Sequence, residues 1–293
     1  MVVLTLGVPA VALAHGTAPH AGGGPFSPWD LASLACLAIV GTLYVLGSVR
    51  LARRGAVHRR VERIAFGAGW VALAIAMLPP LDSLAVSLFS VHMAQHELMM
   101  LAGVPLVIAG RPLPVCLAGM PAGTRRVVAT MLQAGPASAA WRMFVTPVVA
   151  WALHGAAIWI WHVPALYEMA AANEALHALQ HATFAGTAAL FWWGMLYGRY
   201  GRAGYGVAVF YVFMTTVHTG LLGAVLTLTG SPLYPGYAVT AAARGVDPLE
   251  DQQLAGLIMW VPAGFVLTAL GIALFVAWIG EAERRQRPTR GAT

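Results

Sequence analysis

The sequence predicts an all-α membrane protein, built as a bundle of seven transmembrane helices. Hydrophobic residues make up 59% of its 293 residues and charged residues only 10%, which is typical of polytopic membrane proteins and not of soluble domains. A transmembrane helix needs about 17–25 mostly apolar residues. Apolar segments of spanning length lie at residues 30–49, 64–80, 85–109, 143–163, 175–198, 206–229 and 253–279.

The distribution of arginine predicts the orientation of this bundle. All seventeen basic residues are arginines, and only Arg244 falls on the opposite side of a seven-span arrangement from the other sixteen. Basic residues concentrate in cytoplasmic loops, so we expect the N-terminus outside and the C-terminus in the cytoplasm. The formal net charge of +6 then reflects topology and contact with anionic membrane lipid, and not nucleic-acid binding.

The chain is expected to divide into four parts. Residues 1–14 are apolar and end in Ala-Leu-Ala, which indicates a secretory signal peptide; an uncleaved leader is the alternative. A periplasmic tail follows at residues 15–29, then the transmembrane domain at 30–280 and a cytoplasmic tail at 281–293.

The segments between the expected spans lie alternately on the inner and outer sides of the membrane. The longest inner segment, 110–142, is rich in proline, and a short helix near 123–133 is expected at the membrane interface. The outer segments are 81–84, 164–174 and 230–252. The polar sequence Asp251-Gln252-Gln253 lies where it could cap the outer end of the seventh helix.

Two histidine pairs stand inside the apolar segments. His92 and His96, like His177 and His181, are spaced H-x-x-x-H with glutamine before the second histidine. On a helix, residues i and i+4 share one face about 6 Å apart along the axis, so each pair presents two imidazoles together. The expected orientation places all four in the outer third of the membrane. Polar side chains at that depth are costly, so the pairs predict a metal site.

Imidazole with thioether from methionine is a ligand set suited to copper. The sequence lacks the carboxylate triad of non-haem iron and the cysteine cluster of structural zinc. Hydrogen bonding between helices remains the alternative role for the four histidines. Weaker candidates for copper ligands are His162, His154, His218, Met93 and the tail residues His15 and His20, a flexible capture site.

Two carboxylates are candidates for supporting this site. Glu97 directly follows His96, and one residue along a helix turns its side chain roughly 100° away from the histidine. It would orient a ligand or carry protons. Asp251 would support the site from the seventh helix, or do no more than cap that helix.

Three blocks resemble one known family. They are residues 89–96 (FSVHMAQH) with 105–106 and 110–112, residues 161–167 (WHVPALY) with 177–181 and 191–193, and residues 233–235 with 251–260 (DQQLAGLIMW). Together they resemble the heptahelical CtaG family of cytochrome c oxidase assembly factors, from about Asp82 to Gly280. Two positions depart from the family pattern, which has a second proline where Val104 stands and an aliphatic residue where Glu97 stands. The resemblance implies maturation of a terminal haem–copper oxidase, with oxidase subunits as partners.

The favoured hypothesis is a non-enzymatic assembly factor in the bacterial inner membrane. It would accept copper on the periplasmic side from a donor protein and pass it to the oxidase. No nucleophile–base pair or phosphate-binding loop is recognisable in the sequence. Three alternatives are a copper or proton conduit through Glu97, His154 and His218, a haem-binding electron-transfer protein, and a scaffold whose histidines are structural.

Overall fold

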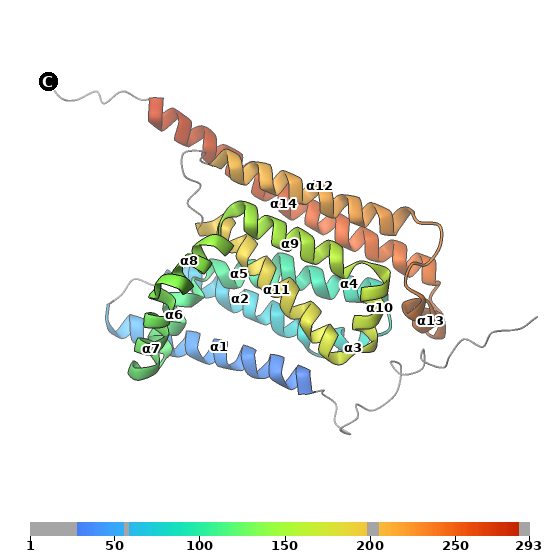
Figure 1. Cartoon of the computed structure of the whole chain (residues 1–293), viewed down its shortest axis with the longest axis horizontal. Helices are drawn as coiled ribbons and strands as arrows, with labels where there is room; N and C mark the ends of the chain where they lie inside the picture. Colours follow the sequence, from blue (N-terminus) through green and yellow to red (C-terminus); the bar gives the residue numbers. More distant parts are fainter. Residues whose placement is uncertain (1–27, 56–58, 198–204, 287–293) are drawn as a thin grey trace, which may run out of the picture.

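The computed structural model describes residues 28–55, 59–197 and 205–286, and every regular element within those ranges is a helix (Figure 1). The predicted signal peptide, His15 and His20 lie outside the described residues. Each of the seven apolar segments contains a helix. These are α1 (Pro28–Arg53), α2 (Arg60–Met77), α4 (Phe89–Glu97) continued by the π-helical turn η1 (Leu98–Gly103) and α5 (Val104–Ala109), α9 (Pro147–Trp161), α11 (Glu174–Tyr197), α12 (Tyr205–Leu228) and α14 (Pro248–Gln286).

Four of these segments are long and apolar enough to cross a membrane. They are α1, the continuous run from α4 to α5, α12 and α14. The number rises to five if α8 (Gly135–Phe144) and α9, which meet at a bend of 68°, form one broken span. The chain is therefore a helical, multi-pass membrane protein by length and composition. The number of seven spans and the orientation of the termini stay predictions.

Short helices occupy most of the segments between the long ones. The expected interfacial helix is present as α7 (Ala122–Gln133), which buries none of its residues. The remaining short helices are α3 (Leu81–Ala85), α6 (Pro112–Gly119), α10 (Pro164–Ala172) and α13 (Pro235–Ala243). The sequence did not predict the helices within the outer segments 164–174 and 230–252. Pro164 and Pro235 each stand in the first turn of a helix, where proline is favoured because that turn needs no N–H donor.

The helices pack closely through small residues. α12 and α14 form the closest pair and lie side by side along the upper edge of Figure 1. At their contact a Cβ on Gly223 would lie 2.9 Å from the carbonyl oxygen of Gly256, and a Cβ on Gly256 would lie 2.7 Å from that of Gly223. Only glycine permits this approach. Small residues commonly bring the backbones of membrane helices into contact in this way. α14 also packs against α4, and α9 packs against α11.

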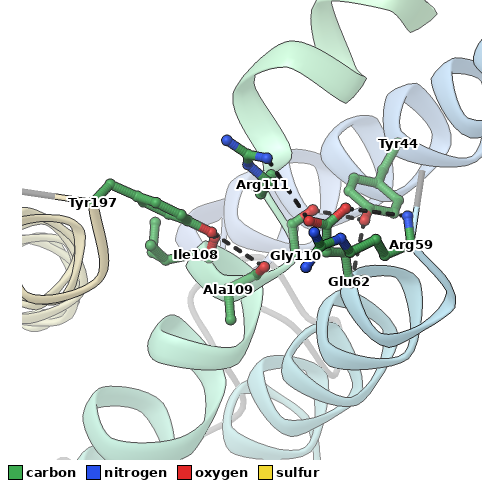
Figure 2. A network of polar contacts seen from close by, with 8 residues as sticks. All are labelled: Tyr44, Arg59, Glu62, Ile108, Ala109, Gly110, Arg111 and Tyr197. Carbon is green, nitrogen blue, oxygen red and sulfur yellow. Dashed lines mark hydrogen bonds and ion pairs between the residues drawn. The ribbon is translucent and has the colours of Figure 1, made fainter. Parts of the chain in front are cut away.

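A polar network ties four helices together at the C-terminal end of α5 (Figure 2). The Tyr44 hydroxyl of α1 donates to the carbonyl oxygen of Gly110 at 2.8 Å, and the Tyr197 hydroxyl of α11 donates to that of Ile108 at 3.0 Å. Arg111, with φ of 53°, places its guanidinium 3.8 Å from the Glu62 carboxylate and 5.6 Å from the centre of the Tyr197 ring. The Gly-Arg-Pro sequence thus anchors one end of the 89–109 helix, and the histidine pair lies at the other.

Candidate metal centre

The helix that carries the first histidine pair begins against a carboxylate of α14. The buried Asp251 accepts hydrogen bonds from the backbone N–H of Phe89 at 2.7 Å and of Ser90 at 3.2 Å, and from the Ser90 hydroxyl. A carboxylate at a helix N-terminus is stabilised by the N–H groups that lack partners within the helix. The expectation that Asp251 caps its own helix was wrong, because Asp247 accepts from Leu249 and Glu250 there. Asp251 instead sets the position of α4.

The four predicted histidines come together between α4 and α11. Nε2 of His92 lies 3.1 Å from Nε2 of His96. One ring nitrogen from each of His92, His96 and His181 lies within 4.8 Å of the other two. His177 stands beside this trio, with its ring centre 5.2 Å from that of His92 and 4.3 Å from that of His181. The helical spacing read from the sequence therefore produces one cluster.

His92 and His96 are shielded from solvent, and the cluster contains ring nitrogens that lack hydrogen-bond partners among the described residues. His92 is 2% exposed and His96 is 1% exposed. Within the described part of the chain, no hydrogen bond reaches Nδ1 of His96 or Nε2 of His181, and both atoms are buried. Leaving a buried polar atom without a partner costs about 1–3 kcal/mol. A bound cation would use both nitrogens, as would an ordered water.

Tyr237 of α13 determines the protonation of His92. Its hydroxyl donates to the Ala85 carbonyl oxygen at 3.1 Å and also contacts Nδ1 of His92. A phenol has one proton, so Nδ1–H of His92 donates to the phenol oxygen and Nε2 keeps its lone pair. Burial, and secondarily the charge of Glu168, raises the pKa of Tyr237 well above its usual value, so the phenol stays protonated. The lone pair of His92 consequently points into the cluster.

A family comparison covers most of these elements. The model of the family described as cytochrome c oxidase caa3 assembly factor (Caa3_CtaG) matches residues 42–281, well over half of the chain. The chain belongs to this family. The match includes both histidine pairs, Tyr237 and Asp251, and it confirms the resemblance read from the three sequence blocks. No curated protein and no solved structure matches the chain.

Among the described residues of this Caa3_CtaG protein, none of the remaining candidate ligands belongs to the trio of His92, His96 and His181. Nδ1 of His162 donates to the carbonyl oxygen of Ile158 at 2.7 Å, and its ring lies 5.9 Å from that of Tyr167, which also neighbours His92. Met93 is buried in the hydrophobic core. His154 lines a different cavity, together with Glu97. His218 lies near Gly155, one helix away from the cluster.

Aromatic rings enclose the cluster in this Caa3_CtaG protein. Phe184 meets the His96 ring edge-on at 4.8 Å, and Tyr167 lies 5.5 Å from His92. Gln95 fixes α4 from the far side, since its amide donates to the Ala76 carbonyl oxygen at 2.6 Å and to the Asp82 carboxylate at 3.0 Å. Sequence reasoning did not identify Tyr237, Tyr167 or the role of Gln95. The sequence contained one signal for the role of Gln95, because a glutamine precedes the second histidine in both pairs.

We expect Tyr237→Phe to weaken copper binding by about 10–100-fold, because residues that orient a metal ligand usually contribute that much. Losing the hydroxyl frees Nδ1 of His92 and allows the tautomer that carries its proton on Nε2. Competition with a Cu(I) chelator would measure the change in dissociation constant. Tyr234→Phe is the control, since the Tyr234 hydroxyl donates to the carbonyl oxygen of His162 and does not contact the cluster. Equal affinities for Tyr237→Phe and the wild type would contradict this role.

Proposed function

We propose that this assembly factor binds copper between α4 and α11 and delivers it to a cytochrome c oxidase subunit by ligand exchange. The observation that carries the proposal is the convergence of His92, His96, His177 and His181 in one buried place, from two pairs 81 residues or more apart in sequence. A set made only of imidazoles, in which ring nitrogens of His96 and His181 lack hydrogen-bond partners among the described residues, suits copper. The cluster contains neither thiolate nor carboxylate.

The proposed setting is the bacterial inner membrane, with the cluster near its periplasmic face. The arginine distribution supports this orientation. A periplasmic copper donor would supply the ion at this face, and the receiving oxidase subunit would remove it there. Delivery needs no catalytic turnover, because each imidazole can be replaced in turn by a ligand of the recipient.

The haem alternative receives little support from the geometry. Two axial histidines must face each other across a flat slot that admits a porphyrin. Here the rings contact one another. Their centres lie 4.3–6.0 Å apart in the pairs His92–His96, His92–His177, His92–His181, His96–His181 and His177–His181. A haem would have to separate α4 from α11.

Copper stoichiometry of the purified protein tests the proposal. We expect the variant His92→Ala with His181→Ala to lose the copper bound by the histidine cluster, since each helix loses one of its two imidazoles. His218→Ala is a matched control, because it removes a histidine from another helix outside the cluster. If the double variant binds copper with the same stoichiometry and nitrogen coordination as the wild type, these residues are not the site.

A further inference from the structure

A second polar pocket lies about one helical turn further along the helix that carries His92 and His96. It is bounded by α4, η1, α9, α11, α12 and α14 and has a volume of about 30 Å³. A single water needs about 10–15 Å³ on this measure, so the pocket admits a small ion. Its polar and sulfur-containing lining consists of Glu97, Met100, His154, Thr215, Thr219 and Met259. None of these residues belongs to the histidine cluster.

A π-helical turn brings one wall of the pocket into place. η1 begins directly after Glu97 and contains Met100. Within it the carbonyl oxygen of Met100 accepts a hydrogen bond from the Trp192 indole at 2.8 Å. Single π turns inside α-helices occur frequently at functional sites, because they cost stability and redirect side chains. The π-helical turn η1 therefore forms part of the wall of the pocket.

The hydrogen bond of His154 determines which of its ring nitrogens carries a lone pair. The Thr187 hydroxyl donates to the carbonyl oxygen of Thr183 at 2.8 Å, so it accepts from Nδ1–H of His154 at 3.1 Å. Nε2 of His154 is then deprotonated and can act as a ligand. The side chain is buried, and its ring stacks on Phe191, which holds its orientation.

Glu97 places a carboxyl group in the pocket, and no cationic side chain among the described residues pairs with it. Its buried Oε2 has no hydrogen-bond partner among the residues that the structure describes. A carboxylate in an apolar membrane interior is costly unless it is paired. A monovalent cation would form a neutral pair with it.

The types of side chain that line the pocket indicate which cation it would bind. Met100 and Met259 are buried thioethers, and with the His154 imidazole they form a soft set that favours Cu(I). Hard divalent ions need six or more oxygen ligands. The side chains here offer only the carboxylate and two threonine hydroxyls, whose protons are donated to the carbonyl oxygens of Tyr211 and Thr215.

We propose that this pocket is a second metal site, which binds Cu(I) through Met100, Met259 and His154 and balances its charge with Glu97. The identity of the ion rests on the proposed function, since copper would be the cargo of both sites. The adjacent positions of His96 and Glu97 on α4 place the two sites next to each other along one helix. The second site gives the protein capacity for a second copper ion in a sulfur-containing environment.

Anaerobic titration of the purified full-length protein with Cu(I), read by metal content and X-ray absorption, tests this inference. We expect the wild type to bind two ions with both nitrogen and sulfur neighbours. Met100→Leu with Met259→Leu should lose one ion and the sulfur signal. Leucine nearly conserves the volume of methionine, so the core should remain folded. Glu97→Gln should weaken only the sulfur-coordinated ion.

The histidine variant separates this inference from the proposed function. His92→Ala with His181→Ala should retain one sulfur-coordinated ion. If the wild type shows no sulfur neighbour, or if the methionine variant binds as many ions as the wild type, the second site is refuted and the histidine site is unaffected. If the histidine variant keeps both ions, the proposed function fails while the sulfur signal still decides the second site.

Discussion

A strain whose only copy of this assembly factor carries His92→Ala and His181→Ala is expected to lose oxidase activity to the level of a strain without the gene. The substitutions leave one imidazole on α4 and one on α11, which cannot reproduce the coordination offered by four. Oxidase subunits would still be synthesised, but the enzyme would lack copper. Oxygen consumption by membranes supplied with reduced cytochrome c would measure activity, and metal analysis of the purified oxidase would measure its copper content.

Two companion strains make this result specific to the cluster. His218→Ala should retain normal oxidase activity, because His218 lies outside the cluster. Growth of the double-variant strain with excess copper should restore part of the activity, since a delivery protein matters most when its cargo is scarce. Fully active oxidase in the double variant at limiting copper would mean that the histidines are structural.

Asp251→Ala is expected to destabilise the protein and to disrupt the copper site together. The substitution leaves two backbone N–H groups and one hydroxyl at the start of α4 without their acceptor. Hydrogen bonds to charged groups contribute about 1.5–3 kcal/mol each, so we expect the loss of all three to cost at least about 4.5 kcal/mol. The thermal unfolding midpoint in detergent should fall by about 5–10 °C. Copper affinity should fall as well, because the position of His92 depends on the start of α4.

Two further variants isolate the cause of this loss. Asp251→Asn keeps an oxygen acceptor of nearly the same shape and should retain much of the stability. Asp247→Ala removes the cap of α14 and should cost only about 1 kcal/mol, with no effect on copper affinity. A thermal midpoint for Asp251→Ala that equals that of Asp247→Ala would show that the contact with α4 contributes little.

The features that could be predicted from the sequence are those that depend on local patterns of residues. Apolar length located a helix in each of the seven expected segments, because burying backbone in lipid requires helices. The i, i+4 spacing predicted that His92 and His96 share a face, and likewise His177 and His181. The meeting of the two pairs followed from their equal expected depth. The inferences about helices and shared faces use periodicity or composition within a single segment, whereas the meeting of the two pairs was inferred from the expected topology of the bundle.

The features that the sequence did not reveal depend on long-range contacts. Asp251 was interpreted as a cap of its own helix because capping rules are local, whereas the amides it binds lie 161 and 162 residues earlier. Tyr237 lies 145 residues from His92, and no spacing rule connects them. The π-helical turn also has no simple sequence signature, because its stability depends on neighbours such as Trp192.

The cap on α4 has a consequence for biogenesis. The ribosome completes α4 and α11 long before it reaches Asp251, which lies in the first turn of the last long helix. Until α14 is inserted, the start of α4 lacks its acceptor, and the first histidine pair is not held in place. A nascent chain would thus complete the histidine cluster only near the end of translation.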